Sequence, residues 1–271
     1  MNAAIAIERV TKRFPLPGSK EGVLALSELS LTIAPGEFVA ILGPSGCGKS
    51  TLLRLVASLE QPTGGAVSVN GAAPGLVSAN HALGVAFQDH ALLPWLSVRD
   101  NVALPFRLAG RRVDETAITR LLELVGLGTF GTARPKQLSG GMRQRASIAR
   151  ALVLEPEVLL LDEPFGALDA VTRRQMNVEL QRIWSARQIT TMLITHSVDE
   201  ALFLADRVVV MSPRPGRVAN IHKVPFPRPR SLEIMSTKEV FDLTNTIKAE
   251  IVGTQQSRFP QASATPAVAA L

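Results

Sequence analysis

A glycine-rich segment, GPSGCGKST at residues 43–51, constrains the fold of this chain more than any other feature of its sequence. It matches the pattern G-x-x-x-x-G-K-[ST], which joins a β-strand to an α-helix around a bound phosphate. Residues 38–42 are an apolar run typical of a buried strand, and residues 51–59 have apolar side chains at helical spacing. We therefore expect a strand, a phosphate-binding loop and a helix in succession. The loop comprises Gly43, Pro44, Ser45, Gly46, Cys47, Gly48, Lys49, Ser50 and Thr51.

The residue types of this loop suit a nucleotide. Glycines let the backbone curve around an anion with its N–H groups pointing inward, and the N-terminus of the following helix is partly positive. We expect Lys49 to reach the β- and γ-phosphates of ATP and the Ser50 hydroxyl to bind Mg²⁺. A turn that binds nothing is the alternative, but it gives no reason for the lysine. Cys47 is interpreted as a small filler of the loop, with a reactive thiol as the other reading.

Two carboxylates follow a second apolar run. Residues 158–161 read as a fully buried strand, and Asp162 and Glu163 come directly after it, at the edge of the sheet where α/β proteins bind ligands. In a nucleotide site Asp162 would hold Mg²⁺ and Glu163 would polarise the water that attacks the γ-phosphate. The alternative is a solvated pair in an ordinary turn.

Short aliphatic runs alternate with helical patterns over most of the chain, which predicts an α/β fold with a largely parallel central sheet. Further strands are expected at residues 191–195 and 207–211. Residues 5–10 and 29–33 alternate apolar and polar side chains, so we expect a mixed sheet with an antiparallel edge there.

The helical patterns divide the chain. Residues 111–125 and 141–154 have helical spacing with no convincing strand between them, so a helical subdomain is expected at about residues 88–156, as an insertion within the α/β domain. Residues 228–271 are predicted to form a short extension, with an amphipathic helix at 232–252 and a flexible tail of small and polar residues at 253–271.

Composition narrows the class of protein. With 46% hydrophobic residues among 271, the chain can bury a core, which excludes a disordered, collagen-like or coiled-coil chain. One cysteine and four scattered histidines exclude a disulfide framework and give no zinc-ligand spacing. No apolar run approaches the roughly 18 residues that span a bilayer, and we expect neither a membrane span nor a secretion signal. A net charge of +6 points only weakly to polyanionic partners.

A third motif lies between the other two. The segment LSGGMRQR at residues 138–145 closely resembles the signature motif of ATP-binding cassette (ABC) proteins, and the three motifs stand in that family's order. Ser139 can cap a helix, while Gly140 and Gly141 leave backbone N–H groups bare for a second anion contact. The resemblance implies a P-loop NTPase fold, with an ATP-binding domain at residues 5–227 and the helical subdomain inserted between the Walker A and Walker B elements.

The same resemblance implies roles for four other residues. Gln88 resembles the family's Q-loop glutamine, which contacts Mg²⁺ or the attacking water, and Asp169 resembles the D-loop aspartate at the dimer contact. His196 resembles the switch histidine that hydrogen-bonds the γ-phosphate. Phe14 occupies the approximate place of the aromatic that stacks on adenine, with a core phenylalanine as the alternative. Met142 departs from the family pattern, where glutamine is common.

A finer resemblance concerns three segments, at residues 91–102, 142–145 and 208–217, which are similar to those of the nitrate, sulfonate and taurine group of bacterial importers. It implies a homodimer in which the loop of one copy and Ser139 of the other enclose each ATP. It also implies integral-membrane permease subunits contacted near Gln88 to Trp95, a periplasmic solute-binding protein acting indirectly, and a peripheral place on the cytoplasmic face of the bacterial inner membrane. The competing reading of Leu93, Trp95 and Leu96 is that they belong to the core of the helical subdomain.

Other functions explain fewer of these motifs. A soluble cassette ATPase acting on nucleic acid or ribosomes resembles proteins with two cassettes or a long inserted coiled coil, and this chain shows neither, so no nucleic-acid partner is expected. A cassette that binds ATP without turnover would not need both Glu163 and His196. A metabolic kinase would not explain the Ser139 motif.

Overall fold

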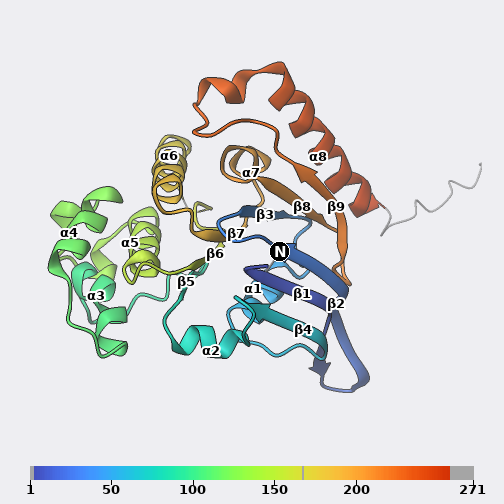
Figure 1. The fold of residues 1–271 in the computed structure, drawn as a ribbon, viewed down its shortest axis with the longest axis horizontal. Coiled ribbons are helices and arrows are strands. Elements are labelled where there is room, and N and C mark those ends of the chain that lie inside the picture. Colours follow the sequence, from blue (N-terminus) through green and yellow to red (C-terminus); the bar gives the residue numbers. More distant parts are fainter. Residues whose placement is uncertain (1–2, 167, 257–271) are drawn as a thin grey trace, which may run out of the picture.

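The structure, a computed structural model, describes residues 3–166 and 168–256, which form two β-sheets with helices on both sides (Figure 1). The larger sheet has the strand order β5-β6-β7-β3-β8-β9. Its first five strands are parallel, and β9 pairs antiparallel with β8. The sheet is therefore mixed and largely parallel. Its strands are β5 (Leu83–Ala86), β6 (Val158–Asp162), β7 (Thr190–Ile194), β3 (Phe38–Leu42), β8 (Arg207–Met211) and β9 (Val218–Lys223).

The two alternating segments near the N-terminus pair antiparallel, but they do not form an edge of this sheet. They belong to β1 (Ile5–Leu16) and β2 (Ser19–Ile33), which with β4 (Gly64–Val69) make a separate sheet in the order β2-β1-β4. The reason is that their apolar faces pack on α1 (Lys49–Val56) and on one face of β3, in a cluster that includes Ile5, Leu29, Ile41 and Leu52. The antiparallel edge of the larger sheet is β9, which the sequence did not predict.

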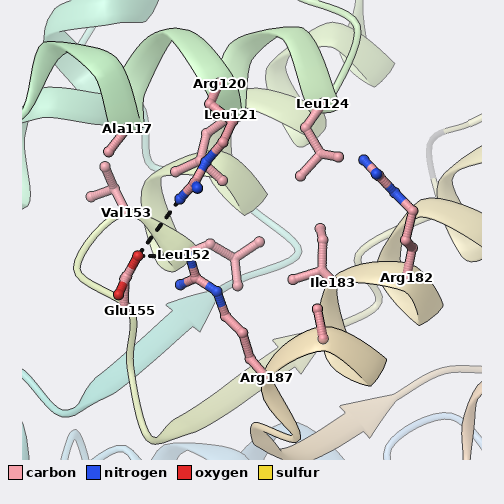
Figure 2. Close-up of a pocket in the computed structure, with 11 residues that line it drawn as sticks. Ala117, Arg120, Leu121, Leu124, Leu152, Val153, Glu155, Arg182, Ile183 and Arg187 are labelled. Atoms are coloured by element: carbon pink, nitrogen blue, oxygen red, sulfur yellow. Dashed lines mark hydrogen bonds and ion pairs between the residues drawn. The ribbon is translucent and has the colours of Figure 1, made fainter.

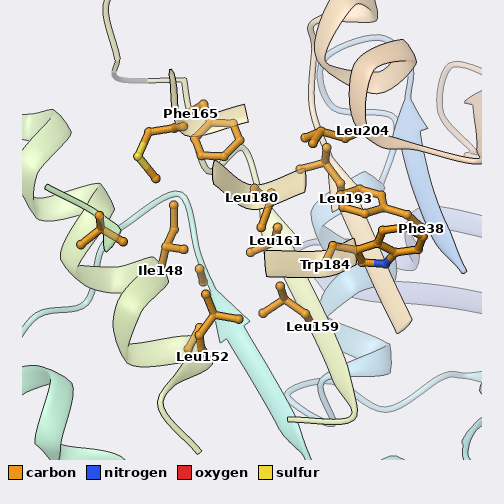
Figure 3. Close-up of a cluster of buried hydrophobic side chains, with 14 of the residues drawn as sticks. Phe38, Ile148, Leu152, Leu159, Leu161, Phe165, Leu180, Trp184, Leu193 and Leu204 are labelled. Carbon is orange, nitrogen blue, oxygen red and sulfur yellow. The ribbon is translucent and has the colours of Figure 1, made fainter. Parts of the chain in front are cut away.

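Strand β3 is buried on both faces. Val39 and Ile41 face the α1 side, whereas Phe38, Ala40 and Leu42 face the opposite cluster. There the Phe38 ring meets Trp184 of α6 (Ala170–Arg187) edge to face, with ring centroids 6.1 Å apart (Figure 3). Burial on both faces explains the unbroken apolar run of β3. Because β3 is an inner strand of the sheet, the glycine-rich loop that follows it lies near the middle of the sheet's edge.

The helical group lies beside β5 (Figure 1) and consists of α3 (Val98–Leu108), α4 (Glu115–Leu124) and α5 (Gly140–Leu152), with short turns η1 (Gly128–Phe130) and η2 (Pro135–Gln137). Residues 88–156, all of them described, contain no strand. The starts of α4 and α5 follow from their caps, because Asp114 accepts a hydrogen bond from the N–H of Ala117 (2.9 Å) and Ser139 from that of Met142 (3.2 Å). Helix α3 was not predicted.

A small cavity of about 190 Å³ marks the junction of this helical group with α6 (Figure 2). Its floor is apolar and includes Leu121 and Ile183, and at its rim the Glu155 carboxylate pairs with Arg187 at 2.6 Å and with Arg120 at 3.7 Å. Glu155 and Arg120 are more than half exposed, so these ion pairs add little to stability.

Residues after β9 wrap across α7 (Val198–Leu204) towards η3 (Glu233–Ser236) and α8 (Lys238–Gln256). The helix predicted over 232–252 is thus two elements, and residues 253–256 of the predicted tail continue α8, while residues 257–271 lie outside the described part. Arg230 anchors this segment: its buried guanidinium donates to the carbonyls of Leu202, Phe203 and Ala205 at the end of α7. Burial lowers the pKa of Arg230 to about 10.

Helix α2 (Pro74–Ala79) joins β4 to β5. Within the described residues, none of the helices combines the length and the hydropathy that a membrane-spanning segment needs.

Candidate functional site

Four neighbouring strands bring the predicted site residues to one edge of the larger sheet. Strands β3, β7, β6 and β5 are adjacent and parallel, so the segments after their last residues meet at the same edge. The loop at residues 43–51 follows β3, the acidic pair ends β6, His196 follows β7 and Gln88 follows β5. Strand β7 ends at Ile194 rather than at the expected residue 195.

The loop is folded tightly against its own chain. Gly48 caps α1 with φ +104°, and a Cβ there would lie 2.7 Å from Cδ2 of Leu26 and 3.1 Å from the carbonyl of Ala25. Only glycine fits both the backbone and the space. Lys49 is buried, with 8% of the residue exposed, and its ammonium donates to the carbonyls of Gly43 (2.8 Å) and Pro44 (3.0 Å). The first N–H groups of α1 therefore adjoin a buried cation, an arrangement suited to an anion.

Cys47 is a buried filler of this loop. The residue is 1% exposed, and burial raises the pKa of its thiol more than the nearby Lys49 lowers it. The thiol form is therefore favoured, which argues against a reactive role.

The Ser50 hydroxyl and the Asp162 carboxylate meet across the sheet edge, with Oγ 3.2 Å from Oδ1. Burial raises the pKa of Asp162, the charge of Glu163 raises it further, and the bond from Ser50 opposes both. Nearby positive charge would offset this cost of burying a carboxylate. The described residues contain no cluster of three or more acidic, histidine or cysteine ligands. A hydroxyl and one carboxylate nevertheless fit Mg²⁺, which usually keeps waters and takes phosphate oxygens as its other ligands.

Glu163 and His196 face each other beside this pair. Oε2 of Glu163 lies 3.6 Å from Nδ1 of His196, and the two side chains are 24% and 60% exposed. The backbone of Glu163 has φ +48°, and its N–H donates to the carbonyl of Ile194 at 2.8 Å. A left-handed conformation in a bulky residue is uncommon, and here it turns the carboxylate towards His196 and the solvent.

Behind these residues lies a buried polar group that the sequence analysis missed. The Thr195 hydroxyl donates to Glu200 at 2.6 Å, and the Arg173 guanidinium lies 3.6 Å from the same carboxylate. Arg173 also donates to the carbonyls of Phe165 and Leu168. This group joins the segment after β7 to the segment after β6. The only sequence signal was a pair of carboxylates, Asp199 and Glu200, at the start of the otherwise apolar α7.

Asp169 caps α6, accepting from the N–H groups of Val171 (3.1 Å) and Thr172 (3.0 Å), and these bonds lower its pKa. The neighbouring Ala167 lies outside the described residues. Gln88 is exposed, two residues beyond the β5 residue that pairs with Leu161. Asp169 and Gln88 therefore lie near the site without contacting its central residues in any described bond.

Phe14 is half-buried on β1 and is not part of the core. It pairs with Val23, two residues before the Ala25 that packs on Gly48, and the Lys12 ammonium lies 4.8 Å from its ring centroid. One face of the ring is thus covered by a cation, and the ring lies along the strands that flank the loop.

The segment at residues 138–141 lies apart. No hydrogen bond joins it to residues 43–51, all of which are described, and Ser139 is exposed at the start of α5. Helix α5 is instead tied to the segment after Gln88, because Arg150 donates to the carbonyls of Ala91 (2.7 Å) and His90 (2.9 Å). Arg150 was a further residue that the sequence analysis missed.

Comparisons with known proteins agree with this architecture. The family described as ABC transporter matches residues 26–166. A putative ATP-binding protein of Brucella abortus is 50% identical over 228 residues, which cover 83% of this chain and 87% of that protein. The nitrate import ATP-binding protein NrtD of Synechococcus elongatus is 46% identical over 229 residues, 83% of this chain and 82% of that protein.

Among solved structures, the dimeric ATP-binding cassette MJ0796 in a post-hydrolysis state with ADP and phosphate is similar, with a TM-score of 0.75 and 30% identity. The match covers 82% of this chain and 100% of that one. The predicted P-loop NTPase fold is confirmed. The chain belongs to the ABC transporter family, as an ABC ATPase that resembles the nitrate importer group.

Proposed function

We propose that this ABC ATPase powers solute uptake as the ATP-hydrolysing subunit of a bacterial importer with a separate permease, of the nitrate, sulfonate and taurine type. The observation that carries the proposal is the assembly of Lys49, Asp162, Glu163 and His196 at one sheet edge, in a chain similar over most of its length to a nitrate import subunit.

The loop at residues 43–51 would hold the phosphates of ATP through its N–H groups and Lys49, and the Phe14 ring would stack on adenine. Ser50, Asp162 and Gln88 would hold Mg²⁺, with water and phosphate completing its shell. The ion would supply charge neutralisation at the phosphates. The raised pKa of Asp162 supports this assignment, since a buried carboxylate gains most from a nearby cation.

Glu163 would orient the attacking water and accept its proton, while His196 would donate a hydrogen bond to the γ-phosphate. Their separation of 3.6 Å supports the pairing, because the two groups can face one water and one phosphate oxygen together. Thr195, Glu200 and Arg173 would hold the His196 segment in register with the segment after β6.

The second half of each ATP site would come from another copy of the chain. Ser139, Gly140 and Gly141 present a helix N-terminus that contacts no residue of the loop in its own chain. In a head-to-tail homodimer they would meet the nucleotide bound by the partner, with Asp169 at the contact. The solved cassette with ADP and phosphate is itself dimeric.

The permease would be contacted at residues 88–95. Trp95 is 65% exposed, whereas Leu92 is half-buried and packs on the core, so the segment divides between surface and interior. Arg150 links this segment to α5, so a movement of α5 on ATP binding would be felt there. The protein would be peripheral, on the cytoplasmic face of the inner membrane, and a periplasmic solute-binding protein would act through the permease.

The test is an affinity pull-down of tagged Glu163→Gln protein, with ATP and Mg²⁺, from solubilised membranes of the host. We expect a polytopic membrane protein, and a Trp95→Ala bait should recover much less of it. The same bait loaded with ADP is the nucleotide control. Recovery of ribosomal or nucleic-acid-bound proteins in place of a permease would overturn the importer and favour the soluble cassette.

A further inference from the structure

The segment between β8 and β9 packs directly on the phosphate-binding loop. It closes on itself through a bond from the N–H of Ser212 to the carbonyl of Arg217 (3.0 Å). It is pinned to β2, because the N–H of Gly216 donates to Ala25 (2.9 Å) and the carbonyl of Gly216 accepts from Ser27 (3.1 Å). In the sequence, this segment is notable only for its resemblance to one importer group, which predicts no role for it in the site.

Gly216 shows how close the approach is. A Cβ at this position would lie 2.1 Å from the carbonyl oxygen of Cys47 and 2.8 Å from the Met211 side chain. The first of these contacts is with backbone inside the loop, which cannot give way without moving the loop itself. Glycine is therefore required here by contact with the phosphate-binding loop.

The close approach brings a guanidinium onto the loop. Nε and Nη2 of Arg214 both lie 3.2 Å from the carbonyl oxygen of Gly46. Gly46 belongs to a turn that is closed by the N–H of Cys47 on Pro44 (3.3 Å), and Pro44 also accepts from Lys49. The turn is thus held by the Arg214 guanidinium at the carbonyl of Gly46 and by the Lys49 ammonium at the carbonyl of Pro44.

The charge of Arg214 is not neutralised by a neighbour. Among the described residues, no carboxylate lies within ion-pair distance of it, and its Nη1 donates to no group. The nearby Arg217 differs, since it donates to Ser27 at 3.1 Å and its charge helps to lower the pKa of Glu28. Arg214 therefore brings free donors and an unpaired positive charge to the loop, a combination that suits phosphate oxygens.

We propose that Arg214 is a second cation of the nucleotide site: it fixes the turn at Gly46 and binds the polyphosphate of the nucleotide together with Lys49. The inference rests on the proposed function only in requiring that the loop binds ATP. It adds a binding residue that lies outside the glycine-rich loop, the acidic pair and the Ser139 segment.

The test measures dissociation constants for ATP, ADP and pyrophosphate by calorimetry, for the wild type and for Arg214→Ala, Arg214→Lys and Arg217→Ala. We expect Arg214→Ala to weaken the binding of all three ligands by about tenfold, the cost of one charge-assisted contact. Arg214→Lys should recover part of the lost affinity. Arg217→Ala, the matched control, should show no loss of affinity. The salt dependence of binding should fall in Arg214→Ala, because one cation fewer faces the phosphates.

Unchanged binding in Arg214→Ala would overturn the inference while leaving ATP binding by the loop intact. An equal loss in Arg217→Ala would also overturn it, since both variants would then act only by loosening the segment. A wild type that fails to bind ATP would overturn the proposed function as well. Melting temperatures of all four proteins separate these outcomes from unfolding.

Discussion

The phosphate-binding loop and the Ser139 segment are both glycine-containing helix starts, yet their glycines have different causes. A Cβ on Gly48 would meet Leu26 at 2.7 Å, so the packing of its own chain excludes any other residue. A Cβ on Gly140 would meet nothing closer than an Arg143 nitrogen at 3.9 Å, so its own chain leaves room for alanine. The first glycine is explained by packing within one copy, whereas the packing of its own chain does not require the second.

This difference supports a site divided between two copies. The loop half is packed against its own chain, with Lys49 already bonded to loop carbonyls and Ser50 to Asp162. In the other half, Ser139 is exposed at the end of a helical group that is joined to α6 across a small cavity. A divided site also explains how ATP could govern assembly, since its phosphates would contact both halves.

The largest expected effect concerns the chemistry of the loop half. Glu163→Gln keeps the size of the side chain but removes the base, so we expect turnover to fall by about a hundredfold or more while ATP still binds. ATP should then hold the chain as a dimer, which size-exclusion chromatography with and without ATP would detect. Hydrolysis at the wild-type rate would remove Glu163 from its proposed role.

A mixing experiment tests the division directly. Ser139→Arg and Lys49→Ala proteins should each be nearly inactive as homodimers, because every site has one damaged half. In a mixture, some dimers would carry one site with both halves intact, so partial ATPase activity should return. Mixtures no more active than the separate proteins would contradict a shared site.

A pair of glycine substitutions sharpens the comparison. Gly140→Ala should leave the melting temperature unchanged, because its own chain leaves room for the added methyl. It should lower turnover severalfold, because in the proposed dimer the methyl would meet the partner-bound nucleotide. Gly48→Ala should lower the melting temperature as well, since φ +104° and Leu26 both oppose it. If Gly140→Ala destabilised the chain as much as Gly48→Ala, the contrast between the two regions would disappear.

The loop half was also the more predictable from sequence. Strands β3 and β8 have the bounds that their unbroken apolar runs predicted, because burial on both faces leaves a continuous signal. Strand β9 was missed since most of its residues are exposed. Helix α3 was missed because Pro105 and the buried Asn101, which bonds to the 93–97 turn, interrupt its apolar pattern.

Three of the missed site residues are arginines that share one kind of contact. Arg150, Arg173 and Arg214 each donate to backbone carbonyls of segments far away in the sequence or beyond a turn. Such bonds have no periodicity and no preferred spacing, so they leave no pattern in the chain. Motifs with a required spacing could be found, whereas the residues that hold those motifs in place needed the structure.

The smallest expected effect is on stability, and it has opposite signs at two aspartates. Burial raises the pKa of Asp162, so its ionised form costs stability. The contribution of this group to stability is fully present below the ordinary value of 3.8 and is lost as pH rises through the raised pKa. The cap bonds lower the pKa of Asp169, so its charge contributes stability above 3.8 that is lost as pH falls through the lowered pKa.

Without nucleotide or Mg²⁺ at pH 7, Asp162→Asn should therefore melt a few degrees higher than the wild type, and Asp169→Asn slightly lower. Both differences should shrink as the pH is lowered towards 3, which a series of thermal melts would show. Adding Mg²⁺ and ADP should make the wild type more stable than Asp162→Asn, because only the wild type has a carboxylate at position 162 to bind the ion. If Asp162→Asn were less stable than the wild type at neutral pH, the bond from Ser50 would outweigh the cost of burying the charge of Asp162. The carboxylate would then cost the loop half no stability without the metal ion, and Mg²⁺ binding would have no such cost to offset.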